Sequence, residues 1–161
     1  MTYNISGRKQ NLTLQRCNCT PYLKRDIDIP ANCTIISEKT FQNRSMIQSV
    51  SFPYGLKQIG SNAFSGCSRL KHLLLPESLC QIGKEAFSNC KAVKEINLPV
   101  SVETVADGAF SNMDKLALTS SALTTTYGKN VFQKTTLSEV TLMQSSTLYD
   151  YVKNSAKKLS Y

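Results

Sequence analysis

The stretch from Pro53 to Leu98 consists of two copies of one 23-residue unit. The first copy is Pro53-YGLKQIGSNAFSGCSRLKHLLL, and the second is Pro76-ESLCQIGKEAFSNCKAVKEINL. Leu, Ile-Gly, Ala-Phe-Ser, Cys and the closing Leu occupy the same positions in both copies. A fixed period of this length predicts a solenoid, because each unit can bury its apolar side only by stacking on its neighbours.

The same period extends to either side of this stretch. Pro30, Pro53, Pro76 and Pro99 follow one another at intervals of 23 residues. In four successive units, the sixth, eleventh and seventeenth residues after the proline are large and apolar. These core ladders are Ile36, Ile59, Ile82 and Val105; Phe41, Phe64, Phe87 and Phe110; and Ile47, Leu70, Val93 and Leu116.

Each unit contains the elements of one coil. A closing segment such as 71–75 predicts a short strand that ends at proline, which cannot continue a β-ladder. The segment 63–67 is too short for a full helix and favours one helical turn. Gly60 and Gly83 mark bends of the chain. Strands stacked about 4.8 Å apart would form a parallel sheet roughly 25–30 Å long over six coils.

The two ends of the chain depart from the repeat. Alternating residues in Tyr3–Ile5 and Leu12–Leu14 predict a β-hairpin that caps the first coil. Apolar residues at helical spacing after Ser145, with lysines towards the end, predict a C-terminal helical cap. We therefore expect a single domain over residues 1–161, with caps at 1–19 and 144–161 and repeats at 20–143.

The pattern Pro-x-Ser-Leu-x-x-Ile-Gly-x-x-Ala-Phe-x-x-Cys, which Pro76 begins, resembles the BspA-like (Treponema-type) leucine-rich repeats. The resemblance implies a leucine-rich repeat solenoid of the α/β horseshoe class, rich in β-structure. It implies about six coils, a parallel concave sheet and short helical turns on the convex side. Members are similar to bacterial and protist surface proteins that adhere to host proteins or cells, although fold alone does not fix function. Arg44 and Met113 depart from the pattern at the Cys position, and Ser37 and Ala106 at the Gly position.

The register predicts which side chains face the concave sheet. If the seventeenth, twentieth and twenty-second residues of a unit are buried, then the nineteenth and twenty-first face outward. The candidate ligand-binding residues are Asp26, Asp28, Ser49, Ser51, His72, Leu74, Glu95 and Asn97. The same rule extends the face to Leu118, Ser120, Glu139 and Thr141.

The chain carries a net charge of +8, and much of the positive charge lies beside this sheet rather than on it. The candidate basic rim is Arg25, Arg69, Lys71, Lys91, Lys94 and Lys115. Such a rim favours a protein or an anionic glycan as partner, rather than nucleic acid. The alternative interpretation is a charged edge that keeps an extended surface soluble.

Enzymatic and metal chemistry are not favoured. Ser49, His72 and Glu95 share one position on three consecutive coils, in the order of a nucleophile, a base and an orienting acid. A hydrolase built on this row is a remote alternative, because nothing marks an oxyanion hole or a nucleophile elbow. His72 is the only histidine, so no histidine-based metal site is expected, and no cofactor is predicted.

Five of the six cysteines divide into two groups. Cys67 and Cys90 share one position of the unit and Cys33 lies where other units have leucine, so all three are expected to be free thiols in the core. Cys17 and Cys19 match no strong zinc pattern, and a bridge from this pair to Cys33 stays open.

The leading hypothesis is a non-enzymatic protein-binding or adhesion module, expected to be a monomer. The family resemblance favours a cell-surface or secreted protein. The N-terminus shows no apolar signal-peptide core, and the sequence has no apolar run long enough to span a membrane. These two observations keep a cytoplasmic location open. An intracellular scaffold that uses the same sheet is therefore the runner-up.

Overall fold

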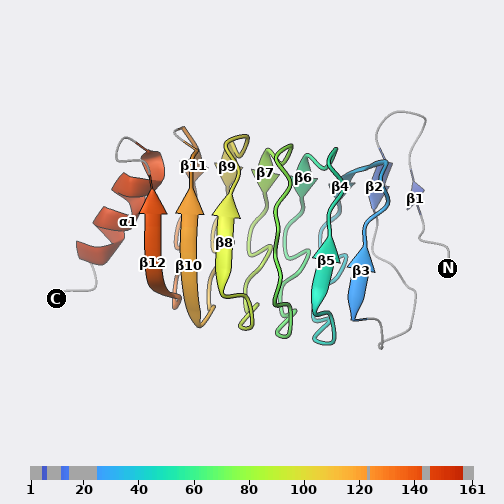
Figure 1. The fold of residues 1–161 in the computed structure, drawn as a ribbon, viewed down its shortest axis with the longest axis horizontal. Helices are drawn as coiled ribbons and strands as arrows, with labels where there is room; N and C mark the ends of the chain where they lie inside the picture. The colour runs from blue at the N-terminus through green and yellow to red at the C-terminus, as the bar shows by residue number, and fades with distance from the viewer. Residues whose placement is uncertain (1–4, 7–11, 15–24, 123, 143–145, 158–161) are drawn as a thin grey trace.

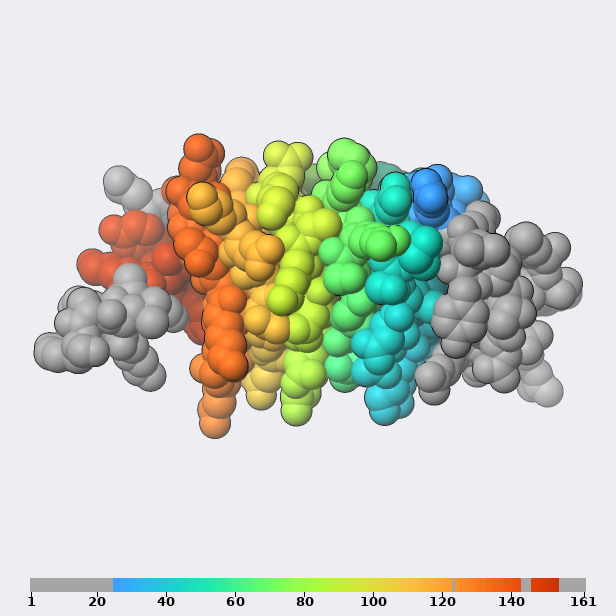
Figure 2. Space-filling view, turned by 90° about the horizontal axis from the view of Figure 1, so that it is seen from below, coloured from blue at the N-terminus to red at the C-terminus, as the bar shows by residue number. Residues whose placement is uncertain are grey.

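The computed structural model describes residues 5–6, 12–14, 25–122, 124–142 and 146–157. They form a stack of coils that begins at the right of Figure 1 and ends at the helix on the left. Figure 2 shows successive coils as neighbouring bands, each against the next. The stack is a parallel β-solenoid of about five turns, which confirms the predicted fold class.

The closing segments form the surface that we call the front sheet (Figure 1). Its strands are β3 (Asp26–Asp28), β5 (Ser49–Ser51), β8 (Glu95–Leu98), β10 (Lys115–Ser120) and β12 (Thr136–Leu142). Every pairing between them is parallel, in the two groups β3-β5 and β8-β10-β12. The strand predicted at 71–75 is reduced to a single bridge between His72 and Ser49.

A seven-stranded back sheet runs along the same stack, in the order β1-β2-β4-β6-β7-β9-β11. Its strands are β1 (Ile5–Ser6), β2 (Leu12–Leu14), β4 (Cys33–Ile36), β6 (Gln58–Ile59), β7 (Gln81–Ile82), β9 (Thr104–Val105) and β11 (Thr126–Tyr127). The antiparallel pair β1–β2 agrees with the predicted hairpin at Ile5 and Leu12–Leu14 and extends the first arm to Ser6, while Tyr3, Asn4 and residues 7–11 lie outside the described residues. Strand β2 pairs with β4 and so joins the hairpin to the stack.

The core lies between the two sheets and is built from the predicted ladders, whose members are all buried. Phe64 stacks on Phe41 with ring centroids 5.0 Å apart, and on Phe87 at 5.3 Å. Phe110 continues the row at 5.7 Å from Phe87, and Phe132 follows at 5.8 Å. Phe64, Phe87 and Phe110 are therefore each covered by the coils on both sides, which is why one unit alone could not bury its ring.

The segment 63–67 is a run of hydrogen-bonded turns, with Ser65 N donating to Asn62 O at 3.2 Å and Cys67 N to Phe64 O at 3.1 Å, and not the regular helical turn that was predicted. Asn62 and Gly66 have left-handed backbone angles, with φ of 56° and 77°, which interrupt any helix. The N–H of Phe64 donates to the carbonyl of Ala86 at 2.8 Å, and that of Gly66 to Ser88 at 2.8 Å. These groups thus bond along the stack to the next coil, where a helix would bond them within one segment.

A one-residue deletion shifts the fourth unit. Leu116 aligns with Val93, but Ala117 already pairs with Glu95, so Lys94 has no counterpart. As a result Leu118 and Ser120 are buried, and their assignment to the exposed face is wrong. In the next unit the outward-facing residues are Glu139 and Thr141, and both are exposed.

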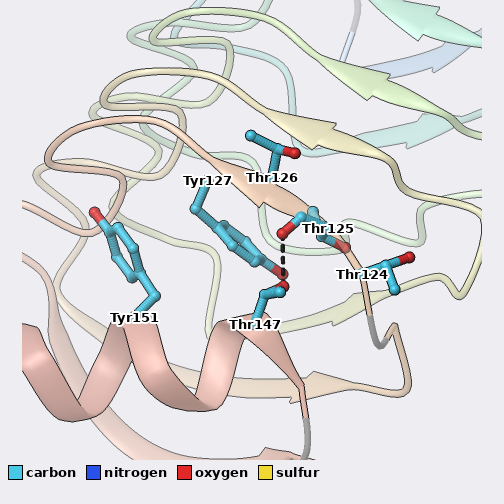
Figure 3. Close-up of a pocket in the computed structure, with 6 residues that line it drawn as sticks. All are labelled: Thr124, Thr125, Thr126, Tyr127, Thr147 and Tyr151. Atoms are coloured by element: carbon cyan, nitrogen blue, oxygen red, sulfur yellow. Dashed lines mark hydrogen bonds between the residues drawn. The ribbon is translucent and has the colours of Figure 1, made fainter.

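Helix α1 (Thr147–Lys157) confirms the predicted C-terminal helical cap and continues the phenylalanine ladder. The Tyr151 ring meets Phe132 edge-on at 6.4 Å, and its hydroxyl oxygen accepts the N–H of Val131 at 2.9 Å. Thr147 Oγ1 donates to the carbonyl of Thr125 at 2.6 Å (Figure 3). The helix therefore satisfies backbone and aromatic groups that a further coil would otherwise cover.

The thiols of Cys67 and Cys90 form a ladder inside the stack. Cys67 Sγ donates to the carbonyl of Phe41 at 3.3 Å, and Cys90 Sγ to that of Phe64 at 3.2 Å. Both cysteines are buried and free, as predicted, and Cys33 is buried as well, while Cys17 and Cys19 lie outside the described residues. Burial raises the pKa of Cys67 to about 12 and raises that of Cys90 as well.

We predict that the thiol ladder makes stability fall at alkaline pH. Folded Cys67 keeps its proton up to a pKa of about 12, whereas an unfolded thiol loses it near 9.0. Above that lower pKa the unfolded state binds fewer protons, so the free energy of unfolding decreases as pH rises. The double variant Cys67→Ala, Cys90→Ala should lose less stability between about pH 8 and 10.5 in urea titrations, despite being less stable at neutral pH. An unchanged pH slope would contradict this.

We predict that Gly83 admits no side chain. A Cβ there would lie 2.6 Å from Ser61 N and 2.7 Å from Gly60 C, both backbone atoms of the preceding coil. Gly83→Ala should lower the free energy of unfolding by about 1–3 kcal/mol or more, measured by urea denaturation. Gly55→Ala is the matched control, since its Cβ would meet nothing within 4 Å. Equal stability of the two variants would show that the coils can move apart.

Candidate functional site

The exposed side of the front sheet presents two side chains from each closing segment. On β3, Asp26 and Asp28 are exposed while Ile27 between them is buried. On β8, Glu95 and Asn97 alternate in the same way with buried Ile96 and Leu98. The predicted ligand-binding residues all lie on this side; only Ser49 among them is half-buried rather than exposed. The structure thus places residues that are far apart in the sequence, from Asp26 to Asn97, on one surface.

Leu74 interrupts this polar surface. Its side chain is 76% exposed, although Leu73 and Leu75 on either side are 4% and 9% exposed. The same position on neighbouring coils carries Ser51 and Asn97. Nothing in the packing of the coil requires an apolar residue here, so Leu74 is an exposed apolar side chain near the middle of the sheet.

The Ser49-His72-Glu95 row does not have the hydrogen bonding of a catalytic triad. Ser49 Oγ donates to Asp26 Oδ1 at 2.5 Å, so the hydroxyl hydrogen points to the preceding coil. The backbones of Ser49 and His72 pair, but the described residues include no hydrogen bond between the two side chains. His72 and Glu95 are both exposed on a flat surface. The row is therefore a polar ladder along the sheet.

The basic rim lies along one margin of the front sheet. All of its members are exposed: Arg25, Arg69, Lys71, Lys91, Lys94 and Lys115. Lys71 N donates to Gln48 O, and Gln48 N to Arg25 O, so these residues follow one another coil by coil. Within the described part of the chain the one ion pair joins Lys39 and Glu38, at 3.7 Å, and none involves the rim. Within the described residues, no rim side chain therefore forms an ion pair with a carboxylate.

An open pocket that the sequence did not indicate lies where α1 meets the last coil (Figure 3). It is lined by Thr124, Thr125, Thr126, Tyr127, Thr147 and Tyr151. The run of three threonines before Tyr127 was the available signal, but their proximity to the helix depends on tertiary packing. None of the predicted site residues lines this pocket.

The described residues contain neither a metal-binding cluster nor a membrane-spanning helix. No cluster of three or more His, Cys, Asp or Glu side chains is arranged to hold a metal ion. None of the described helices is long and apolar enough to cross a bilayer.

Two solved structures are similar to this chain. A leucine-rich repeat protein from Bacteroides ovatus is 32% identical, with a TM-score of 0.55, over 68% of this chain and 28% of that protein. A T. pallidum leucine-rich repeat protein is 19% identical, with a TM-score of 0.47, over 99% of this chain and 93% of the other. The chain therefore spans little more than a quarter of the Bacteroides protein. A search of curated proteins found no match.

A family model, the BspA type leucine-rich repeat region, matches residues 34–159 in six copies. This range takes in the core ladders, the front sheet from β5 to β12, and α1. Proteins built from leucine-rich repeats are in general scaffolds for protein interaction. The matched residues make up well over half of the sequence, and the chain belongs to the BspA-type leucine-rich repeat family.

Proposed function

We propose that this chain is a non-enzymatic protein-binding module of the adhesion type, which recognises a macromolecular partner through its front sheet and basic rim. The observation that carries the proposal is Leu74, 76% exposed among polar side chains. A large apolar side chain held on a rigid sheet, surrounded by polar groups, has the arrangement of a binding hot spot. Burying a leucine side chain contributes about 1.5–3 kcal/mol, which a partner would recover on docking.

The polar residues around Leu74 support specificity rather than affinity. His72, Ser51 and Asn97 offer hydrogen-bonding groups on a surface that the stacked backbone keeps rigid. Asp26 and Asp28 make the first coil acidic. A partner would therefore meet an acidic end, an apolar centre and a basic margin, which together determine its orientation.

The basic rim supports an anionic partner. Its side chains are exposed and take part in no ion pair among the described residues. Unpaired charges at a margin accelerate association and select partners of opposite charge, and their effect weakens as salt rises. Sulfated glycans and acidic protein segments both fit this chemistry.

We predict that the double variant Lys71→Glu, Lys94→Glu binds heparin several-fold more weakly than the wild type, because both side chains belong to the rim. Heparin-column elution and titration at two salt concentrations measure the effect. The matched control is Lys57→Glu, Lys84→Glu, which changes net charge equally at exposed lysines outside the rim. Equal losses in both double variants would show that only net charge matters, and would contradict a localised rim.

We predict that Leu74→Asp folds normally and loses partner binding by about tenfold or more, since it removes an exposed anchor and places a charge at the centre of the sheet. Pull-downs from extracellular-matrix extract and from cell lysate supply the readout. Val100→Asp is the control, because Val100 is 65% exposed but lies outside the front sheet. Proteins retained equally by both variants would contradict a role for Leu74.

The same pull-downs test the second candidate, an intracellular scaffold. Cys67, Cys80 and Cys90 are free thiols, which suits a reducing compartment. Specific partners from the lysate alone would favour the scaffold, whereas partners from the matrix extract alone would favour adhesion.

A further inference from the structure

Strand β12 is the last strand of the front sheet and, among the described residues, pairs on one side only, with β10. With seven residues it is also longer than β10, which has six. The residue Ser138 is an extra one in the ladder, since Leu137 pairs with Leu116 and Glu139 with Ala117. Such a bulge is a common protection for an edge strand. The regular segment 139–142, which follows the bulge, has no protection against pairing with a further strand except the charge of Glu139.

The inward row of β12 is incompletely covered. On β10 the inward residues Leu116, Leu118 and Ser120 are all buried. Val140, which pairs with Leu118, is 40% exposed, and Leu142 is half-buried. Helix α1 packs against β11 at the back of the last coil and leaves Val140 partly open. Among the described residues, apolar surface and backbone groups without a strand partner therefore lie together along one edge.

We propose that the 139–142 edge of β12 binds an extended segment of a different protein, which adds one strand to the front sheet. Backbone hydrogen bonds would join the strand, and its apolar side chains would cover Val140 and Leu142. The residue beside Glu139 would be lysine or arginine, because opposite charges on neighbouring strands stabilise a sheet. The segment thus has the pattern basic, apolar, polar, apolar.

Charge argues against a second copy of this chain as the occupant. In a head-to-tail assembly, β12 would lie beside β3 of the next copy. Glu139 pairs with Ala117 and Ala117 with Glu95, and the same row of positions includes Asp26 on β3. Glu139 of one copy would therefore lie next to Asp26 of the other. In a tail-to-tail pair, two copies of Glu139 would face the same side of one short ladder. Like charges in these positions are destabilising, so a foreign strand with a cation is favoured over self-association.

The test uses a labelled peptide, Ser-Lys-Ile-Thr-Ile-Lys-Ser, which reads identically in both directions and so places lysine beside Glu139 in either orientation. Fluorescence anisotropy should show tighter binding of this peptide than of Ser-Glu-Ile-Thr-Ile-Glu-Ser, by about fivefold to tenfold. Glu139→Lys should reverse the preference. Glu77→Lys, an exposed substitution of the same charge away from β12, should leave it unchanged.

Three outcomes would overturn the proposal. These are no binding of the lysine peptide, a preference that Glu139→Lys does not alter, and equal binding of a backbone N-methylated peptide, which cannot form the ladder. Sedimentation that shows a dimer which Glu139→Lys strengthens, because the new lysine would face Asp26 of a second copy, would assign the edge to that copy instead. Leu74→Asp should bind the peptide like the wild type, so this result is independent of the proposed function of the front sheet.

Discussion

Every feature of this molecule depends on hydrogen bonds and ring stacking between one coil and the next. Backbone N–H groups such as that of Phe64 donate to the following coil, and the phenylalanine row passes through the stack at 5.0–5.8 Å. A single coil has too little interior to bury its own aromatic ring, so folding and stacking are one event. The same constraint keeps Gly83 without a side chain, because its neighbour's backbone lies too close.

The stacking of coils also determines which side chains are available to bind a partner. Since inward positions are used by the ladders, a closing segment offers only alternate residues to a partner, and the rim adds the residues just before the strand. Leu74 and the lysines of the rim matter for this reason: they are on rigid backbone and serve no packing role. The ends of the stack are different, because there the ladders have no next coil. Tyr151 closes the aromatic row at the back, whereas at the front no described residue pairs with the outer edge of β12.

The differences between prediction and structure have local causes. The expected regular helical turn at 63–67 does not form because left-handed Asn62 and Gly66 direct alternate N–H groups along the stack. Leu118 was assigned to the wrong side because a one-residue deletion inverts every later side chain of a strand. Nothing in the local residues marks that deletion, since Leu116 still fits the old register. The threonine-lined pocket beside Tyr127 was missed because it exists only where α1 docks.

The sequence by itself determined the solenoid, its period, the buried ladders and the side chains of the regular coils that face outward. It could do so because a periodic pattern repeats one set of local choices, and stacking leaves them one consistent arrangement. Only the tertiary structure decided the shifted face after Leu116, the hydrogen bond that commits Ser49 to Asp26, and the open edge of β12. These three features depend on how one particular coil packs against its neighbour, and a pattern common to all units carries no information about a single contact.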